Sequence, residues 1–194
     1  MVALRKQTPS GMTVDEFLAW VPDDGSVRGW QLIDGEPSAM APAREQHAII
    51  QGQLVRQIGN HLEDRPGLCR VAVTPGIVPR ARASYNFRIP DIAVTCGPLS
   101  NDVTISEPTI LIEVLSPSNE ADTRANVWAY TTIPSVREIL IVRSTRIEAE
   151  LLRRRDDGSW PDEPAFLGAD DDIVLTSIDI TMTMRSVYRR TSLG

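Results

Sequence analysis

The chain lacks most of the features that mark membrane, exported and zinc-binding proteins. No apolar stretch approaches 18 residues, which argues against a membrane-spanning helix. Residues 1–11 include Arg5 and Lys6 but no apolar signal segment, so we expect a cytoplasmic protein. The two cysteines, Cys69 and Cys96, do not have CxxC spacing. We therefore expect them to be reduced thiols rather than a disulfide or a zinc site.

Lysine and net positive charge are also scarce. Only one of the 20 basic residues is a lysine, and the formal net charge is −6. This balance argues against a dedicated nucleic-acid coat protein. A segment from 65 to 90 without Asp or Glu is nevertheless basic, which suits a phosphate-bearing substrate, although arginines on the solvent face of a strand pair explain it equally well. Its arginines are Arg65, Arg70, Arg80, Arg82 and Arg88.

Length and patterning predict one α/β domain with a central mixed sheet flanked by helices. A chain of 194 residues, 42% of them hydrophobic, can bury one core and is short for two. We expect residues 1–11 to form a flexible tail and residues 12–194 to form the domain. A capping box at Thr13 and Glu16 predicts a short N-terminal helix, and apolar residues at helical spacing predict a long one over 44–63.

Short apolar runs predict the strands. Asp34-Gly35 lies between two such runs and predicts a β-hairpin near the N-terminus. A further helix is expected from about 118 to 131. The apolar residues between Ile178 and Val187, together with free strand edges, predict a two-fold homodimer. The expected strands are 30–33, 38–40, 68–78, 91–96, 109–115, 138–142, 146–152, 164–168 and 173–180.

Two carboxylates interrupt these apolar runs. Asp91 opens one predicted strand, and Glu113 lies inside the next. Because two buried carboxylates on neighbouring strands raise each other's pKa, something cationic is expected between them. Mg²⁺ accepts carboxylate oxygens, so the sequence predicts a Mg²⁺ or Mn²⁺ site on the sheet. The alternative is a buried salt-bridge network in which the two acids pair with Arg88 and Arg124.

Several short motifs follow one another along nearly the whole chain, from about residue 12 to 188. They are Trp30-Gln31-Leu32-Ile33-Asp34-Gly35-Glu36, His47, Ile89-Pro90-Asp91, Glu113-Val114-Leu115-Ser116-Pro117-Ser118, and Asp122 with Tyr130. The series resembles the putative restriction-endonuclease family, formerly a domain of unknown function, within the PD-(D/E)XK nuclease superfamily. The resemblance implies a restriction-endonuclease-like core, often in a homodimer, and Mg²⁺-dependent cleavage of DNA.

The resemblance also implies roles for individual residues. Asp91, Glu113 and the backbone carbonyl of Val114 would bind Mg²⁺, which would polarise the scissile phosphate and activate a water. His47 would contact the substrate or orient the water, although an ordinary residue at the start of a helix explains it equally well. The remaining implied substrate contacts are Arg88 and Arg124.

The chain departs from the family pattern in two ways, at the lysine and at Gln31. The superfamily lysine, expected two residues after Glu113, is Leu115, and the family's alternative lysine, four residues after Asp122, is Asn126. Gln31 stands where the family usually has a glutamate. Losing one electrostatic stabiliser costs about 10²–10³ in rate, so Asn126→Lys should raise cleavage by about 10-fold or more. The alternative function is therefore a degenerate nuclease fold that binds DNA or a protein partner without cutting.

Overall fold

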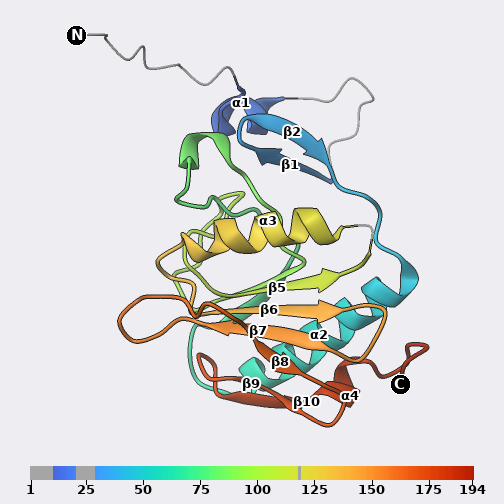
Figure 1. The fold of residues 1–194 in the computed structure, drawn as a ribbon. Helices are drawn as coiled ribbons and strands as arrows, with labels where there is room; N and C mark the ends of the chain where they lie inside the picture. The colour runs from blue at the N-terminus through green and yellow to red at the C-terminus, as the bar shows by residue number, and fades with distance from the viewer. Residues whose placement is uncertain (1–10, 21–28, 118) are drawn as a thin grey trace.

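Across the described residues, 11–20, 29–117 and 119–194, the computed structural model contains a six-stranded mixed sheet (Figure 1). Strands β5 and β6 are parallel, and the other neighbouring strands are antiparallel. Helix α3 (Glu120–Thr131) forms the crossover that a parallel pair requires. The mixed sheet predicted from the sequence is therefore confirmed. The strands lie in chain order: β3 (Arg70–Val73), β4 (Ile92–Thr95), β5 (Pro108–Leu115), β6 (Glu138–Arg143), β7 (Ala149–Arg153) and β8 (Ala165–Leu167).

Side chains of β5 alternate between the two faces of the sheet. Ile112 and Val114 belong to the core under helix α2 (Glu45–Glu63), whereas Leu111 and Leu115 belong to the core under α3. Glu113 has the parity of Leu111 and Leu115, so its side chain faces α3. Because side chains alternate along β5, the carboxylate of Glu113 lies in the layer between the sheet and α3.

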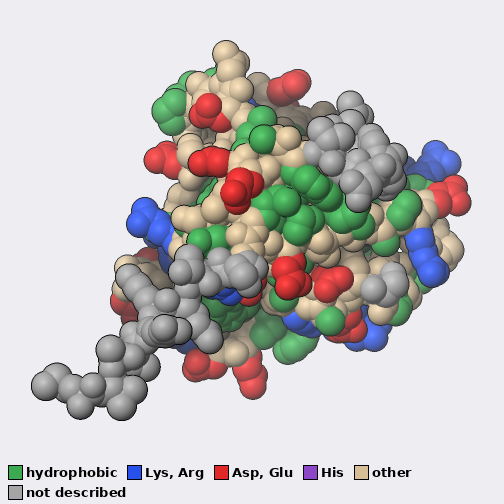
Figure 2. Space-filling view, turned by 90° about the horizontal axis from the view of Figure 1, so that it is seen from above, with side chains coloured by type: hydrophobic (Ala, Val, Ile, Leu, Met, Phe, Trp, Pro, Cys, Tyr) green, Lys and Arg blue, Asp and Glu red, His purple; other side chains and the backbone are tan. Residues whose placement is uncertain are grey.

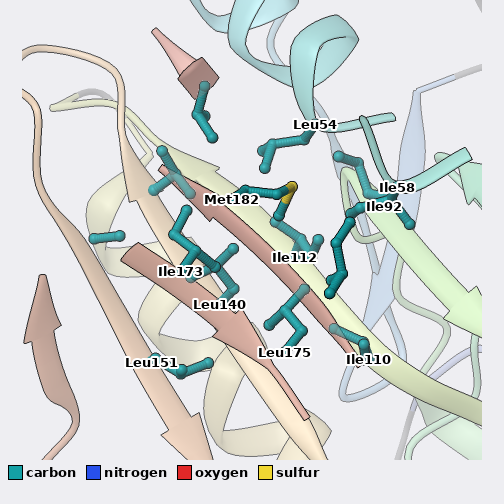
Figure 3. Packing of buried hydrophobic residues seen from close by; sticks show 14 of the residues in the cluster. Leu54, Ile58, Ile92, Ile110, Ile112, Leu140, Leu151, Ile173, Leu175 and Met182 are labelled. Atoms are coloured by element: carbon teal, nitrogen blue, oxygen red, sulfur yellow. The ribbon is translucent and has the colours of Figure 1, made fainter. Parts of the chain in front are cut away.

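The larger core lies between the sheet, α2 and the C-terminal segment. That segment forms strands β9 (Asp172–Leu175) and β10 (Ile180–Thr183) and helix α4 (Met184–Val187). Figure 3 shows Leu54 of α2 and Met182 of β10 converging on Ile112. No helix in the described part of the chain is long and apolar enough to cross a membrane.

Two expectations for this C-terminal segment are wrong. The single strand predicted over 173–180 is an antiparallel hairpin, in which Leu175 pairs with Ile180 and Asp179 has a φ of 51°. Ile178 and Val187 are buried in the core of their own chain, so the apolar tail does not supply a dimer surface. The homodimer itself stays a prediction.

The N-terminal elements match their sequence signals. Helix α1 (Val14–Ala19) begins with the predicted capping box between Thr13 and Glu16. Strands β1 (Trp30–Ile33) and β2 (Glu36–Ala39) form the predicted hairpin, and both turn residues have positive φ, 52° at Asp34 and 91° at Gly35. Gly35 suits this turn because it has no Cβ. Residues 1–10 of the predicted tail lie outside the described residues.

The two cysteines form a disulfide, contrary to the expectation of reduced thiols. Arg70 of β3 and Thr95 of β4 are partners in the antiparallel register, so Cys69 and Cys96 lie opposite each other where the strands end. Their separation of 27 residues gives no hint of this proximity, because register is set by pairing in three dimensions. The bond fastens the edge strand β3 to its neighbour.

Candidate active site

A groove of about 1540 Å³ contains both predicted carboxylates. Its walls come from α1, the β1–β2 hairpin, the start of α2, the segment before β4, the end of β5 and the first turns of α3. Gln31, His47 and Asn126 also line it. The structure therefore brings most of the predicted site residues to one place. Asp91 and Glu113 are only 8% and 5% exposed.

Asp91 is held on both carboxylate oxygens. Its Oδ1 lies 3.0 Å from His47 Nε2, and its Oδ2 accepts a 2.7 Å hydrogen bond from the backbone N–H of Val114. Gln51 Nε2 donates to the backbone carbonyl of Asp91 at 2.8 Å. His47 and Gln51 are four residues apart, so one face of α2 fixes this residue. His47 is thus an orienting contact of Asp91. The contact at Val114 is made by its backbone N–H. The role of its carbonyl as a metal ligand stays a prediction.

Glu113 is held by neutral donors from α3. Its Oε1 accepts a 2.6 Å hydrogen bond from the Tyr130 hydroxyl and a 3.4 Å bond from Asn126 Nδ2. Burial and the charge of Asp91 raise the pKa of Glu113 to about 8, although the hydrogen bonds from Tyr130 and Asn126 act the other way. Without a bound cation, the carboxyl of Glu113 is therefore protonated at neutral pH.

The contact made by Tyr130 was not predicted, although the residue belongs to the motif series. Tyr130 follows Asn126 by four residues, which places both on one face of α3. This spacing of four residues is the sequence signal that could have predicted a shared contact with Glu113. Burial and the adjacent Glu113 raise the pKa of the Tyr130 hydroxyl well above its usual value, so it remains a donor.

The two positions that depart from the family pattern contact each other. Asn126 Nδ2 donates to Gln31 Oε1 at 3.4 Å, and Gln31 Oε1 also accepts from the Ile89 N–H at 3.4 Å. On its other side, Asn126 Oδ1 accepts a 3.3 Å hydrogen bond from Arg88 Nη1. Burial lowers the pKa of the Arg88 guanidinium, and nearby Tyr130 counteracts this. Arg88 and Gln31 are therefore part of the environment of Glu113.

Arg124 lies elsewhere. Its guanidinium binds Glu150 on β7, with Nη2 2.6 Å from Oε1, and it does not line the groove. Two helix positions separate it from Asn126, so it projects from a different face of α3. Within the described residues, neither Arg88 nor Arg124 forms an ion pair with Asp91 or Glu113. The alternative salt-bridge network is therefore wrong.

The carboxylate pair fits a small hard cation. Asp91 and Glu113 are buried, mutually repulsive and, in the described part of the chain, have His47 as their only basic partner within 4 Å. A cluster of three or more His, Cys, Asp or Glu side chains placed to hold an ion does not occur among residues 11–20, 29–117 and 119–194. An ion here would complete its coordination with water or substrate oxygens, which Mg²⁺ does readily.

The groove itself is poor in positive charge. Among its described lining residues, Arg44 is the only Lys or Arg, whereas Asp91, Glu113 and Asp122 are acidic. The predicted basic segment does not change this balance, since Arg65 and Arg82 pair with acids elsewhere. Figure 2 shows acidic and hydrophobic side chains near the centre of one face and basic side chains mostly at its edges.

Comparison with solved structures identifies a protein with the same fold. The fold matches a crystal structure described as "a putative nuclease belonging to DUF820" from Anabaena variabilis, with a TM-score of 0.74 and 16% identity over 91% of this chain and 97% of that one. The fold is thus that of the restriction-endonuclease-like proteins, as the sequence predicted.

The sequence comparisons identify the family. Residues 14–185 match the family model Uma2, described as "Putative restriction endonuclease". The chain belongs to this family. It is also 30% identical over 183 residues to an uncharacterized protein of Synechocystis sp. strain PCC 6803, covering 92% of each chain.

Proposed function

We propose that this protein is a metal-dependent nuclease that hydrolyses phosphodiester bonds of DNA. One observation carries the proposal: two buried carboxylates on adjacent strands face one groove, and no Lys or Arg of the described residues forms an ion pair with either of them. Buried acids are normally paired or bind metals, so the pair marks a cation site. Membership of a nuclease family agrees with that chemistry.

The residues that would hold Mg²⁺ or Mn²⁺ are Asp91 and Glu113, with the carbonyl of Val114 as a further ligand. A bound ion supplies charge for the scissile phosphate and lowers the pKa of a water. His47 holds Asp91 in position, and Tyr130 holds Glu113. Burial and the charge of Asp91 raise the pKa of Glu113, and a divalent ion held here would offset both, so its binding would favour the ionised carboxylate. Substrate contacts fall to His47 and to the amide groups of Asn126 and Gln31.

A second candidate is a nuclease fold that binds nucleic acid or a protein partner without cutting. It is favoured by the neutral side chains at Gln31 and Asn126. Against nucleic acid as the partner stands the lining of the groove, in which Arg44 is the only Lys or Arg among the described residues. Phosphate contacts usually come from Lys and Arg. Binding in such a groove would be weak unless the metal supplies the missing positive charge.

Plasmid nicking in Mg²⁺ and in Mn²⁺ tests the proposal. Wild type should nick the plasmid, and Glu113→Gln should reduce the rate by about 10³-fold or more, because one metal ligand is lost. Asp170→Asn, which alters an exposed ion pair with Arg185, is the control and should leave the rate unchanged. Strong wild-type nicking that Glu113→Gln does not affect would refute the active-site assignment. A metal-dependent gel shift without nicking would favour the second candidate.

The predicted homodimer belongs to the same proposal. One active site cuts one strand at a time, so a two-fold pair of sites suits cleavage of both strands of a duplex. Light scattering at micromolar concentration should give about twice the 21.4 kDa of one chain. A monomer that nicks but does not linearise plasmid would separate the two parts of the proposal.

A further inference from the structure

Arg88 is a buried cation without an acidic partner. The residue is 5% exposed, and no carboxylate of the described residues lies within 4 Å of its guanidinium. Its Nη2 donates to Asn86 Oδ1 at 2.9 Å and its Nη1 to Asn126 Oδ1 at 3.3 Å, while its Nε has no hydrogen-bond partner. A buried charge is costly unless it is paired, so this arrangement requires an explanation other than fold stability.

The backbone holds Arg88 rigidly beside the carboxylate pair. Arg88 and Ile77 exchange two hydrogen bonds, of 2.8 and 2.9 Å, in an antiparallel bridge. Asp91 follows three residues later on the same segment. One short stretch of chain therefore positions both a metal-binding carboxylate and a buried guanidinium, and the two are related by local geometry rather than by loose side-chain packing.

We propose that Arg88 is the positioning residue that, acting through the Asn126 amide, takes the place of the lysine this site lacks. This inference rests on the proposed nuclease function. The guanidinium occupies Asn126 Oδ1, so the amide must present its NH₂ group to Glu113 and the groove. A rotated amide would place its oxygen against the carboxylate and its NH₂ against the guanidinium, and both contacts would be repulsive.

The positive charge also strengthens the donor. A hydrogen bond from a guanidinium to an amide oxygen polarises the amide, and chains of hydrogen bonds reinforce one another in a buried site. The two N–H groups of Asn126 are directed at Glu113 Oε1 and Gln31 Oε1, each at 3.4 Å, and a phosphate oxygen that replaces Gln31 as acceptor receives the strengthened hydrogen bond. Arg88 does not touch the substrate in this arrangement. Its positive charge acts on the substrate through the polarised amide of Asn126.

This arrangement changes what a lysine at position 126 would do. Its ammonium would lie against the Arg88 guanidinium, which now contacts Asn126 directly. Two like charges in a buried site repel each other strongly. Asn126→Lys alone should therefore give no gain in cleavage, contrary to the tenfold gain expected from the sequence. The gain should occur only when Arg88 is neutral.

A double-mutant cycle tests the inference. Arg88→Gln should lower kcat about 100-fold with little change in KM, whereas Arg88→Lys should stay within about 10-fold of wild type because the charge remains. The double variant Arg88→Gln/Asn126→Lys should recover most of the loss. Arg82→Gln is the matched control, since Arg82 lies in the same segment but pairs with Asp34, and its kcat should be that of wild type. Equal losses in all three Arg88 variants would overturn the proposal.

Mn²⁺ titration calorimetry provides a readout that does not depend on cleavage. Removing a nearby positive charge should tighten Mn²⁺ binding by about 3- to 10-fold in Arg88→Gln and leave it near the wild-type value in Arg88→Lys. A merely structural arginine would weaken the affinity or leave it unchanged when replaced, and that result would overturn the proposal. If wild type binds Mn²⁺ but cuts no DNA, the proposed function fails, while the direction of the affinity change still decides the role of Arg88.

Discussion

Three buried glutamates lie on neighbouring strands of the central sheet but have different surroundings. Glu138 on β6, Glu150 on β7 and Glu113 on β5 are 0%, 2% and 5% exposed, respectively. Burial alone would raise the pKa of all three by desolvation. Their neighbours, and not their depth, therefore decide which of them carries a charge.

The negative charges of Glu138 and Glu150 are compensated by arginines and, at Glu138, also by backbone donors. Burial acts to raise the pKa of Glu138, but hydrogen bonds from Ser177 and Arg153 outweigh it, and the pKa is lowered. Hydrogen bonds and charge from Arg124, with help from Arg143, lower the pKa of Glu150 despite burial. Both carboxylates are ionised and serve as fixed acceptors inside the fold.

Glu113 receives no such compensation. Its donors, Tyr130 and Asn126, are neutral, and its charged neighbour, Asp91, has the same sign. The chain can evidently neutralise a buried acid, since it does so twice on the same sheet. An acid left uncompensated beside a groove is consequently the one expected to have a function.

The largest expected effect on stability is at Glu138, one of the two compensated glutamates. Glu138→Gln should lower the free energy of unfolding by about 2–3 kcal/mol, because two backbone N–H groups lose a buried, charged acceptor, whereas the Arg153 side chain is 44% exposed and can be solvated by water. Urea unfolding at pH 7 measures it. The control is Asp170→Asn, an exposed pair with Arg185, which should change stability by less than about 0.5 kcal/mol. A loss below about 1 kcal/mol at Glu138 would contradict the comparison.

Glu113→Gln should have the opposite sign in metal-free protein. The pKa of Glu113 is raised from 4.5 to about 8 on folding, so the folded state binds more protons between these values. Wild-type stability is therefore greatest below about pH 4.5 for this group and is lost as the pH rises through about 8. The glutamine variant should be more stable than wild type by about 1–3 kcal/mol at pH 9 and nearly equal to it at pH 5. Thermal unfolding in EDTA at both pH values distinguishes this pattern from a uniform change.

Metal affinity should also depend on the proton that Glu113 carries in metal-free protein. Because Mn²⁺ must displace it from Glu113, affinity should rise by up to about tenfold per pH unit below pH 8 and level off above. Calorimetry in two buffers of different ionisation enthalpy should detect proton release near pH 7. Affinity that is constant from pH 6 to 8 would mean that Glu113 is already ionised without metal.

The smallest effect is expected at Arg124, which the sequence assigned to the substrate. Arg124→Gln should cost about 1 kcal/mol or less, because its side chain is 40% exposed and Arg143 still contacts Glu150 at 3.1 Å. Mn²⁺ affinity and DNA cleavage should remain at wild-type values. A selective loss of DNA affinity in this variant would restore the substrate role that its position on α3 does not support.

Several features were accessible from the sequence because they are local. The capping box of α1, the Asp34-Gly35 turn and the helical spacing of α2 each depend on residues that are close along the chain. Motif order added the family, which explains why Asp91 and Glu113 could be assigned to one site before the fold was known.

The partners of charged and sulfur-bearing side chains were not accessible in this way. The sequence offered Arg88 and Arg124 equally to the two acids, yet Arg124 binds Glu150 and Arg88 binds Asn126. Likewise, Cys69 meets Cys96 only through the β3–β4 register.

Outside the segment 173–180, the sequence by itself indicated the helices, turns and strands, because residues a few positions apart follow periods of 3.6 and 2. The tertiary structure decided which buried charges are compensated. Residues from distant segments must be packed together before a carboxylate has a neighbour, and the nature of that neighbour sets its pKa. The sheet places Glu138 and Glu150 beside arginines and places Glu113 beside Asp91. Because of that difference in packing, Glu113 is the one of the three that we propose to bind a metal ion.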